Sequence, residues 1–125
     1  MQYAALSNGV KLPMIGYGTF LIKDGALCGQ CVTNALEAGY RLFDTAASYE
    51  NEAAIGTALR GSGLPRDELF ITTKLWVQDA SYEGAKAAIE TSLQKLGLSY
   101  IDLYLIHQPM GDYISAYRAM EERCV

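Results

Sequence analysis

The sequence predicts an α/β protein whose strands run parallel in one sheet. Short apolar stretches, typical of buried strands, alternate with longer stretches in which apolar residues recur at helical spacing. These strand–helix units repeat about every thirty residues, and the first three helices each end close to a glycine. Such βα repeats build parallel sheets covered by helices. At 125 residues, we expect a single domain over residues 1–125.

The chain is expected to begin with a β-hairpin. Residues 3–6 and 10–12 are its predicted strands, joined around Asn8-Gly9, a dipeptide that readily adopts the positive φ angles of a tight turn. Pro13 is expected to stop this ladder, because proline has no N–H group to donate.

A strand over residues 15–20 then opens the parallel repeat. Because Gly16 and Gly18 have no side chains, another group can approach the backbone of this strand closely. These glycines do not form a GxGxxG fingerprint, which disfavours a Rossmann fold. Asp24 and Ser81 are the expected N-caps of two later helices. The elements that follow are predicted at residues 24–38, 40–44, 51–60, 69–74, 82–95 and 101–106, with a last helix from 112 or 113. The first of these helices is expected to bury Leu27, Cys31, Ala35 and Ala38.

Composition excludes several classes of protein. Half of the residues are hydrophobic and 19% are charged, which argues against general disorder. A net charge of −4 gives no indication of nucleic-acid or anionic-membrane binding. No apolar run approaches the roughly 18 residues of a membrane span, and residues 1–5 lack a basic region followed by an apolar core. A cytoplasmic protein is therefore expected.

The three cysteines predict neither a disulfide framework nor a metal site. Their number is odd, and no secretory signal accompanies them. Cys28-Gly29-Gln30-Cys31 resembles a redox dithiol motif, although both cysteines also suit the apolar side of a helix. Zinc is disfavoured because no second ligand pair exists and His107 is the only histidine.

Polar side chains of catalytic type follow the predicted strands. Asp44, Lys74 and His107 each lie where an apolar strand ends, and Tyr49 follows Asp44 by five residues. In a parallel βα repeat the carboxyl ends of all strands share one face, and in barrels this face carries the active site. Each residue also has a structural interpretation: Asp44 as a loop cap, Lys74 as a lysine reaching solvent, His107 as a core histidine, and Tyr49 as one of nine tyrosines. Their occurrence at successive strand ends favours function.

These residue types suit the protonation of an alkoxide that develops from a carbonyl. A phenol is a poor proton donor at neutral pH unless a nearby cation favours the phenolate. Lysine supplies such a cation, an aspartate can hold the lysine, and a histidine can orient the reacting oxygen. No side chain delivers hydride, so the reaction requires a nicotinamide cofactor.

Three stretches resemble the aldo-keto reductase family. Residues 39–46, GYRLFDTA, continue through Tyr49, Asn51 and Glu52 into a pattern similar to that family's first signature. Residues 71–76, ITTKLW, are similar to its lysine strand. Residues 92–107, SLQKLGLSYIDLYLIH, are similar to its histidine strand and the preceding helix. The resemblance covers almost the whole chain.

The resemblance implies a TIM (β/α)₈ barrel with an N-terminal hairpin that reduces aldehydes or ketones to alcohols. NADPH is the implied cofactor, with NADH as an alternative, and the substrate is a small carbonyl compound. Tyr49 would be the general acid, Lys74 the cation beside it, Asp44 the ion pair of Lys74, and His107 the group that orients the carbonyl. The implied cofactor-binding residues are Gly18, Thr19, Phe20 and Asp44, and the implied substrate-binding residues are Tyr49, Trp76 and His107.

Length sets a limit on this activity. A complete barrel needs about 250 residues, and four predicted parallel strands make an N-terminal half-barrel fragment. We therefore expect the 125-residue chain alone to show little or no NADPH-dependent reductase activity. The alternative is a non-catalytic half-barrel that acts by assembling with a second half or with itself, through the open edges of its first and fourth strands.

Overall fold

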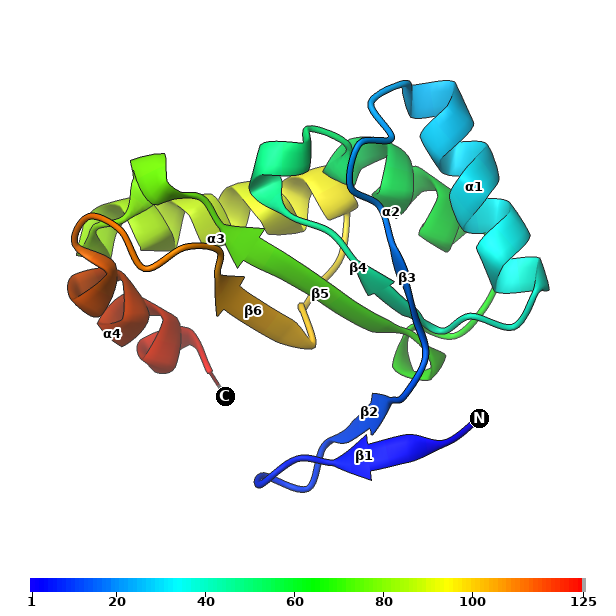
Figure 1. Ribbon diagram of the computed structural model, residues 1–125, viewed down its shortest axis with the longest axis horizontal. Helices are drawn as coiled ribbons and strands as arrows, with labels where there is room; N and C mark the ends of the chain where they lie inside the picture. The colour runs from blue at the N-terminus through cyan, green and yellow to red at the C-terminus, as the bar shows by residue number, and fades with distance from the viewer. Residues whose placement is uncertain (125) are drawn as a thin grey trace.

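A four-stranded parallel sheet is the centre of the computed structural model, which describes residues 1–124 (Figure 1). The strands lie side by side in the order of the sequence. Sequential parallel strands with a helix after each are the arrangement of a (β/α) barrel, of which four strands are present. The strands are β3 (Gly16–Gly18), β4 (Leu42–Asp44), β5 (Phe70–Leu75) and β6 (Leu103–Ile106).

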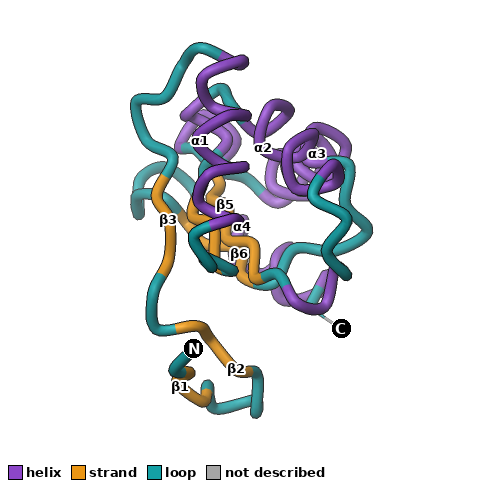
Figure 2. The backbone as a smooth tube through the Cα atoms, turned by 90° about the vertical axis from the view of Figure 1, so that its right-hand side faces the viewer, coloured by secondary structure: helices purple, strands orange, loops and turns teal. Residues whose placement is uncertain are grey.

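The helices pack on one face of this sheet (Figure 2). Capping side chains fix two helix starts as predicted: Asp24 accepts from the Leu27 N–H at 2.7 Å, and Ser81 accepts from the Gly84 N–H at 2.9 Å. No helix within residues 1–124 is long and apolar enough to cross a bilayer. The helices are α1 (Gly25–Glu37), α2 (Glu52–Gly61), α3 (Tyr82–Leu96) and α4 (Tyr113–Arg123).

The N-terminal hairpin, β1 (Tyr3–Ala5) and β2 (Lys11–Pro13), lies apart from the sheet, below β3 in Figure 1. β2 ends at Pro13, where the ladder is predicted to stop, but the missing N–H of Pro13 is not the cause. Pro13 pairs with Tyr3, and beyond it the Met14 N–H donates to the Gln2 carbonyl at 2.9 Å. Antiparallel pairs alternate between hydrogen-bonded and non-hydrogen-bonded positions, and Pro13 occupies a position where no N–H is needed.

Two clusters of buried side chains join the helices to the sheet. The larger one packs α1 and α2 on β4 and β5, and includes Val32, Phe43, Ile55 and Ile71. The smaller one packs α3 and α4 on β5 and β6, around Leu75 and Ala116.

The buried face of α1 differs from the predicted one. Leu27 is 57% exposed, Cys31 is half-buried and Ala38 is exposed. The sequence of α1 contains two apolar stripes at helical spacing, and packing against the sheet and α2 selects between them. The buried residues are Cys28, Val32, Ala35 and Leu36.

The same burial disfavours dithiol chemistry at the two α1 cysteines. Cys28 is fully buried in the larger cluster, and this burial raises the pKa of its thiol. A redox-active pair needs an accessible thiolate. Cys28 therefore acts as a small apolar residue of the core.

Gly56 of α2 lies close against the backbone at the C-terminal end of α3. A Cβ atom added there would overlap the backbone carbonyl of Leu96. We expect Gly56→Ala to destabilise the protein by about 1–3 kcal/mol, because the helices would have to separate. Urea unfolding measures the effect.

Gly29→Ala is the matched control for that variant. Gly29 lies inside α1, and a Cβ there meets nothing within 4 Å. The free energy of unfolding of this variant should rise by about 0.5–1 kcal/mol, because alanine has a higher helix propensity than glycine. Equal effects of the two variants would contradict the close approach at Gly56.

Candidate active site

The Lys74 ammonium is the centre of a polar cluster at the carboxyl ends of the strands. Its Nζ atom donates to Asp44 Oδ2 at 2.8 Å and to the Thr45 carbonyl at 2.9 Å. The same Nζ lies 3.4 Å from the Tyr49 hydroxyl oxygen. Lys74 is largely buried, with 14% of its side chain exposed, so its charge is satisfied by these protein oxygens.

The register of the sheet brings the Asp44 carboxylate and the Lys74 ammonium together. Asp44 pairs with Thr72, and Lys74 lies two residues further along β5. Residues two apart on a strand point to the same face, so Lys74 reaches over Thr72 toward the carboxylate. The Thr45 N–H donates to the Thr72 carbonyl at 2.9 Å, which holds the exit of β4 against β5.

Tyr49 reaches this cluster from a single 3₁₀ turn, η1 (Ala47–Tyr49). Its N–H donates to the Ala46 carbonyl at 3.1 Å, and Glu50 ends the turn in the left-handed region with φ 59°. The Tyr49 ring packs against Phe20, with centroids 5.0 Å apart. Phe20 remains 63% exposed.

His107 follows β6 and faces the same cluster. Its N–H donates to the Leu75 carbonyl at 3.1 Å, which extends the pairing of β5 and β6. The imidazole lies edge-to-face between Tyr49 and Trp76, at centroid distances of 5.7 and 5.2 Å. Burial, and then the charge of Lys74, lower the pKa of His107, whereas Asp44 opposes the shift.

The structure thus brings together Asp44, Tyr49, Lys74 and His107, with Phe20 and Trp76 at their sides. Gly18 pairs with Asp44 in the sheet, and open space lies over its Cα. The Thr19 hydroxyl donates to the Asp44 carbonyl at 3.0 Å, and its side chain is fully buried. This hydrogen bond ties the loop after β3 to the end of β4.

Sequence reasoning missed four residues that build this site. Thr45 supplies a backbone oxygen to Lys74, and Ser48 lies 3.5 Å from the imidazole of His107. Asn51 and Glu52, which belong to the stretch similar to the family signature but were given no role of their own, are buried. A buried position is a tertiary property, and one turn of 3₁₀ helix has no periodicity to detect.

Asn51 and Glu52 tie neighbouring segments to the turn. Asn51 Nδ2 donates to the carbonyls of Thr19 and Ile22 at 2.9 and 3.1 Å, which fixes the loop that carries Phe20. Glu52 accepts from the hydroxyls of Thr73 on β5 and Ser92 on α3, at 2.7 and 3.3 Å.

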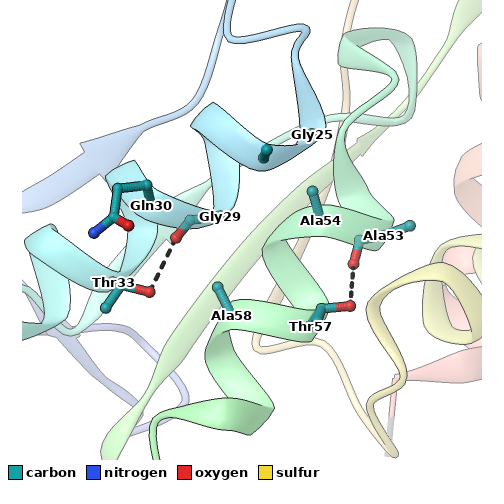
Figure 3. Close-up of a pocket in the computed structure, with 9 residues that line it drawn as sticks. Gly25, Gly29, Gln30, Thr33, Ala53, Ala54, Thr57 and Ala58 are labelled. Carbon is teal, nitrogen blue, oxygen red and sulfur yellow. Dashed lines mark hydrogen bonds between the residues drawn. The ribbon is translucent and has the colours of Figure 1, made fainter.

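Of two hollows on the surface of residues 1–124, one adjoins the cluster and the other lies away from it. The hollow beside the cluster, about 560 Å³, is lined by Ser48 and Trp76 together with residues of α3. The other, about 480 Å³, is a groove between α1 and α2 with a lining of small, uncharged side chains (Figure 3). That groove has no group suited to acid–base chemistry.

Comparison with known proteins decides the family. The family model described as "Aldo/keto reductase family" matches residues 14–123. The chain belongs to this family. It is 47% identical over 118 residues to the glyoxal reductase of Bacillus subtilis, and 49% identical over 123 residues to the oxidoreductase YtbE of the same organism.

Solved structures of aldo-keto reductases share the fold. The Brucella melitensis enzyme superposes with a TM-score of 0.93 at 43% identity, over 97% of this chain and 48% of that one. A Bombyx mori aldo-keto reductase in complex with NADP superposes with a TM-score of 0.90 at 35% identity. The match covers 97% of this chain and 46% of that one. These matches confirm the predicted half-barrel.

The aldo-keto reductase relatives are longer than this chain. The alignments cover 94% of the chain but only 43% of the glyoxal reductase and 44% of YtbE. The chain therefore spans less than half the length of these relatives.

The lowered pKa of His107 has a consequence for stability. The ordinary value is 6.5, and the folded value lies below it. Between the two values the unfolded chain binds more protons, so stability falls as the pH drops below about 6.5. NMR titration of this single histidine measures the folded value directly.

Lys74→Met should raise the pKa of His107, because it removes a cation and leaves Asp44 without its partner. Lys86→Met, on the exposed side of α3, is the control and should leave the titration unchanged. A His107 that titrates at or above 6.5 in the unaltered protein would contradict this account of its surroundings.

Proposed function

We propose that this chain forms the catalytic half of an NADPH-dependent reductase that converts aldehydes or ketones to alcohols. The observation that carries the proposal is the position of Lys74 Nζ, 2.8 Å from the Asp44 carboxylate and 3.4 Å from the Tyr49 hydroxyl. A phenol held beside a fixed cation is suited to give up its proton.

The residues divide the reaction between them. Tyr49 donates its hydroxyl proton to the substrate oxygen, and Lys74 stabilises the phenolate that remains. Asp44 keeps Lys74 charged and in place. His107 donates a hydrogen bond that orients the carbonyl. When bound, the nicotinamide supplies the hydride that the carbonyl carbon accepts, so that the product is the alcohol.

The end of β3 leaves room for part of such a cofactor. Open space over Gly18 adjoins Asp44, and the exposed ring of Phe20 stands next to Tyr49. NADPH is favoured because a family member binds NADP; NADH is the alternative. Glyoxal is a suitable probe substrate, since a relative is a glyoxal reductase. We further propose a cytoplasmic location, on the composition alone.

Tyr49→Phe tests the assigned acid. NADPH consumption with glyoxal is followed for the 125-residue chain alone and for the chain co-expressed with the C-terminal half of the Bacillus subtilis glyoxal reductase. We expect little or no activity from the chain alone. The complemented barrel should lose activity at least 100-fold on Tyr49→Phe, within the range for loss of a general acid.

Tyr117→Phe, at an exposed position of α4, is the matched control and should retain full activity. Substantial activity in Tyr49→Phe would contradict the role of Tyr49. Tight, stoichiometric NADPH binding by the monomeric chain, seen by fluorescence titration, would contradict the need for a second half.

A second candidate function, assembly without catalysis, is favoured by the edges of the sheet. β3 and β6 each pair on one side only. Apolar side chains lie exposed beside these edges: Ile15 is 60% and Leu105 is 37% exposed. Unpaired edges with apolar neighbours favour pairing with another chain. The partner would be a second copy or a separate second half.

Leu105→Lys should weaken such self-association, because it places a charge at the β6 edge. Sedimentation velocity measures the mass in solution. Leu27→Lys is the control, since Leu27 is exposed on α1, in the helical layer. A monomeric unaltered chain, or equal effects of the two variants, would exclude self-assembly through this edge.

A further inference from the structure

Ser48 makes the polar side-chain contact of the His107 ring. Its Oγ atom lies 3.5 Å from His107 Nδ1, and the two residues are half-buried and 59 positions apart. A hydroxyl can donate or accept, and a neutral imidazole carries a proton on only one of its two nitrogens. The direction of this contact therefore sets which nitrogen of His107 can donate to something else.

The other neighbours of the His107 ring do not determine which of its nitrogens carries the proton. Tyr49 and Trp76 meet the imidazole edge-to-face, with interplanar angles of 82° and 75°. Aromatic contacts of this kind hold a ring in place, but they offer no strong acceptor or donor to a particular nitrogen. Within residues 1–124, Ser48 Oγ is the one hydrogen-bond partner that the structure gives to the imidazole.

Backbone hydrogen bonds fix the main chain of Ser48. Ser48 is the middle residue of the η1 turn, which is closed by hydrogen bonds from the N–H groups of Tyr49 and Glu50 at 3.1 and 3.4 Å. The preceding Thr45 is bonded to β5, and the following Asn51 is buried. The Cα atom of Ser48 is thus placed by the same segment that places Tyr49, and the hydroxyl lies within reach of His107.

The charges around the ring favour its neutral form. Burial and the ammonium of Lys74 lower the pKa of His107, and the carboxylate of Asp44 only partly opposes them. A neutral ring whose Nδ1 accepts from Ser48 must carry its proton on Nε2.

We propose that Ser48 is a positioning residue that donates to His107 Nδ1 and thereby keeps the Nε2–H tautomer, which can donate to a carbonyl oxygen. The catalytic meaning of this tautomer rests on the proposed function. The tautomer itself is a property of the chain and can be measured without cofactor or substrate.

Heteronuclear NMR of the imidazole nitrogens tests the proposal in the 125-residue chain. His107 is the only histidine, so one ring gives the whole signal. We expect the Nε2–H tautomer in the unaltered protein above the pKa of His107. Ser48→Ala should shift the tautomer ratio toward Nδ1–H by roughly 2- to 10-fold, the equivalent of one modest hydrogen bond.

Ser48→Thr retains the hydroxyl and should restore the original ratio. Ser115→Ala removes a half-buried serine from α4 and should change nothing. If Ser48→Ala does not fold, Ser48→Cys replaces it, and its weaker S–H donor should give a smaller shift in the same direction.

Two results would overturn the proposal: an Nδ1–H tautomer in the unaltered protein, or a ratio that is unmoved by the loss of the hydroxyl. Neither depends on turnover. If Tyr49→Phe shows that the reductase function is wrong, the tautomer measurement still decides the role of Ser48. If the tautomer prediction fails, the assignment of Tyr49 as the acid is unaffected.

Discussion

The ion pair between Lys74 and Asp44 is the interaction on which the site depends. It joins β4 to β5 at their carboxyl ends and leaves the ammonium within reach of the Tyr49 hydroxyl. A shift of one residue in the pairing of these strands would turn Lys74 to the helical side of the sheet. The cores that hold the strands in register, above all Phe43 and Ile71 beneath the helices, therefore also determine the chemistry.

The segment from Thr45 to Glu52 completes the site beside the ends of these strands. Its carbonyls and side chains contact β5, the loop after β3 and α3, so that three separate parts of the chain are bonded to one turn. Tyr49 and Ser48 project from that turn toward Lys74 and His107. Rigid support of this kind allows short polar side chains to keep a fixed geometry.

The chain combines a compact polar cluster with an open sheet. The four polar residues that carry the proposed proton transfer come from β4, β5, the η1 turn and the exit of β6. The curated relatives that the chain matches are more than twice as long.

The sequence by itself determined the order of strands and helices, the caps at Asp24 and Ser81, and the chemical types at the strand exits. These features depend on local spacing, which a linear pattern records. Only the tertiary structure decided which stripe of α1 is buried, why Pro13 stays in its ladder, and that Ser48 meets a ring 59 positions away. Such outcomes depend on contacts between distant segments, and packing selects them among several locally equivalent choices.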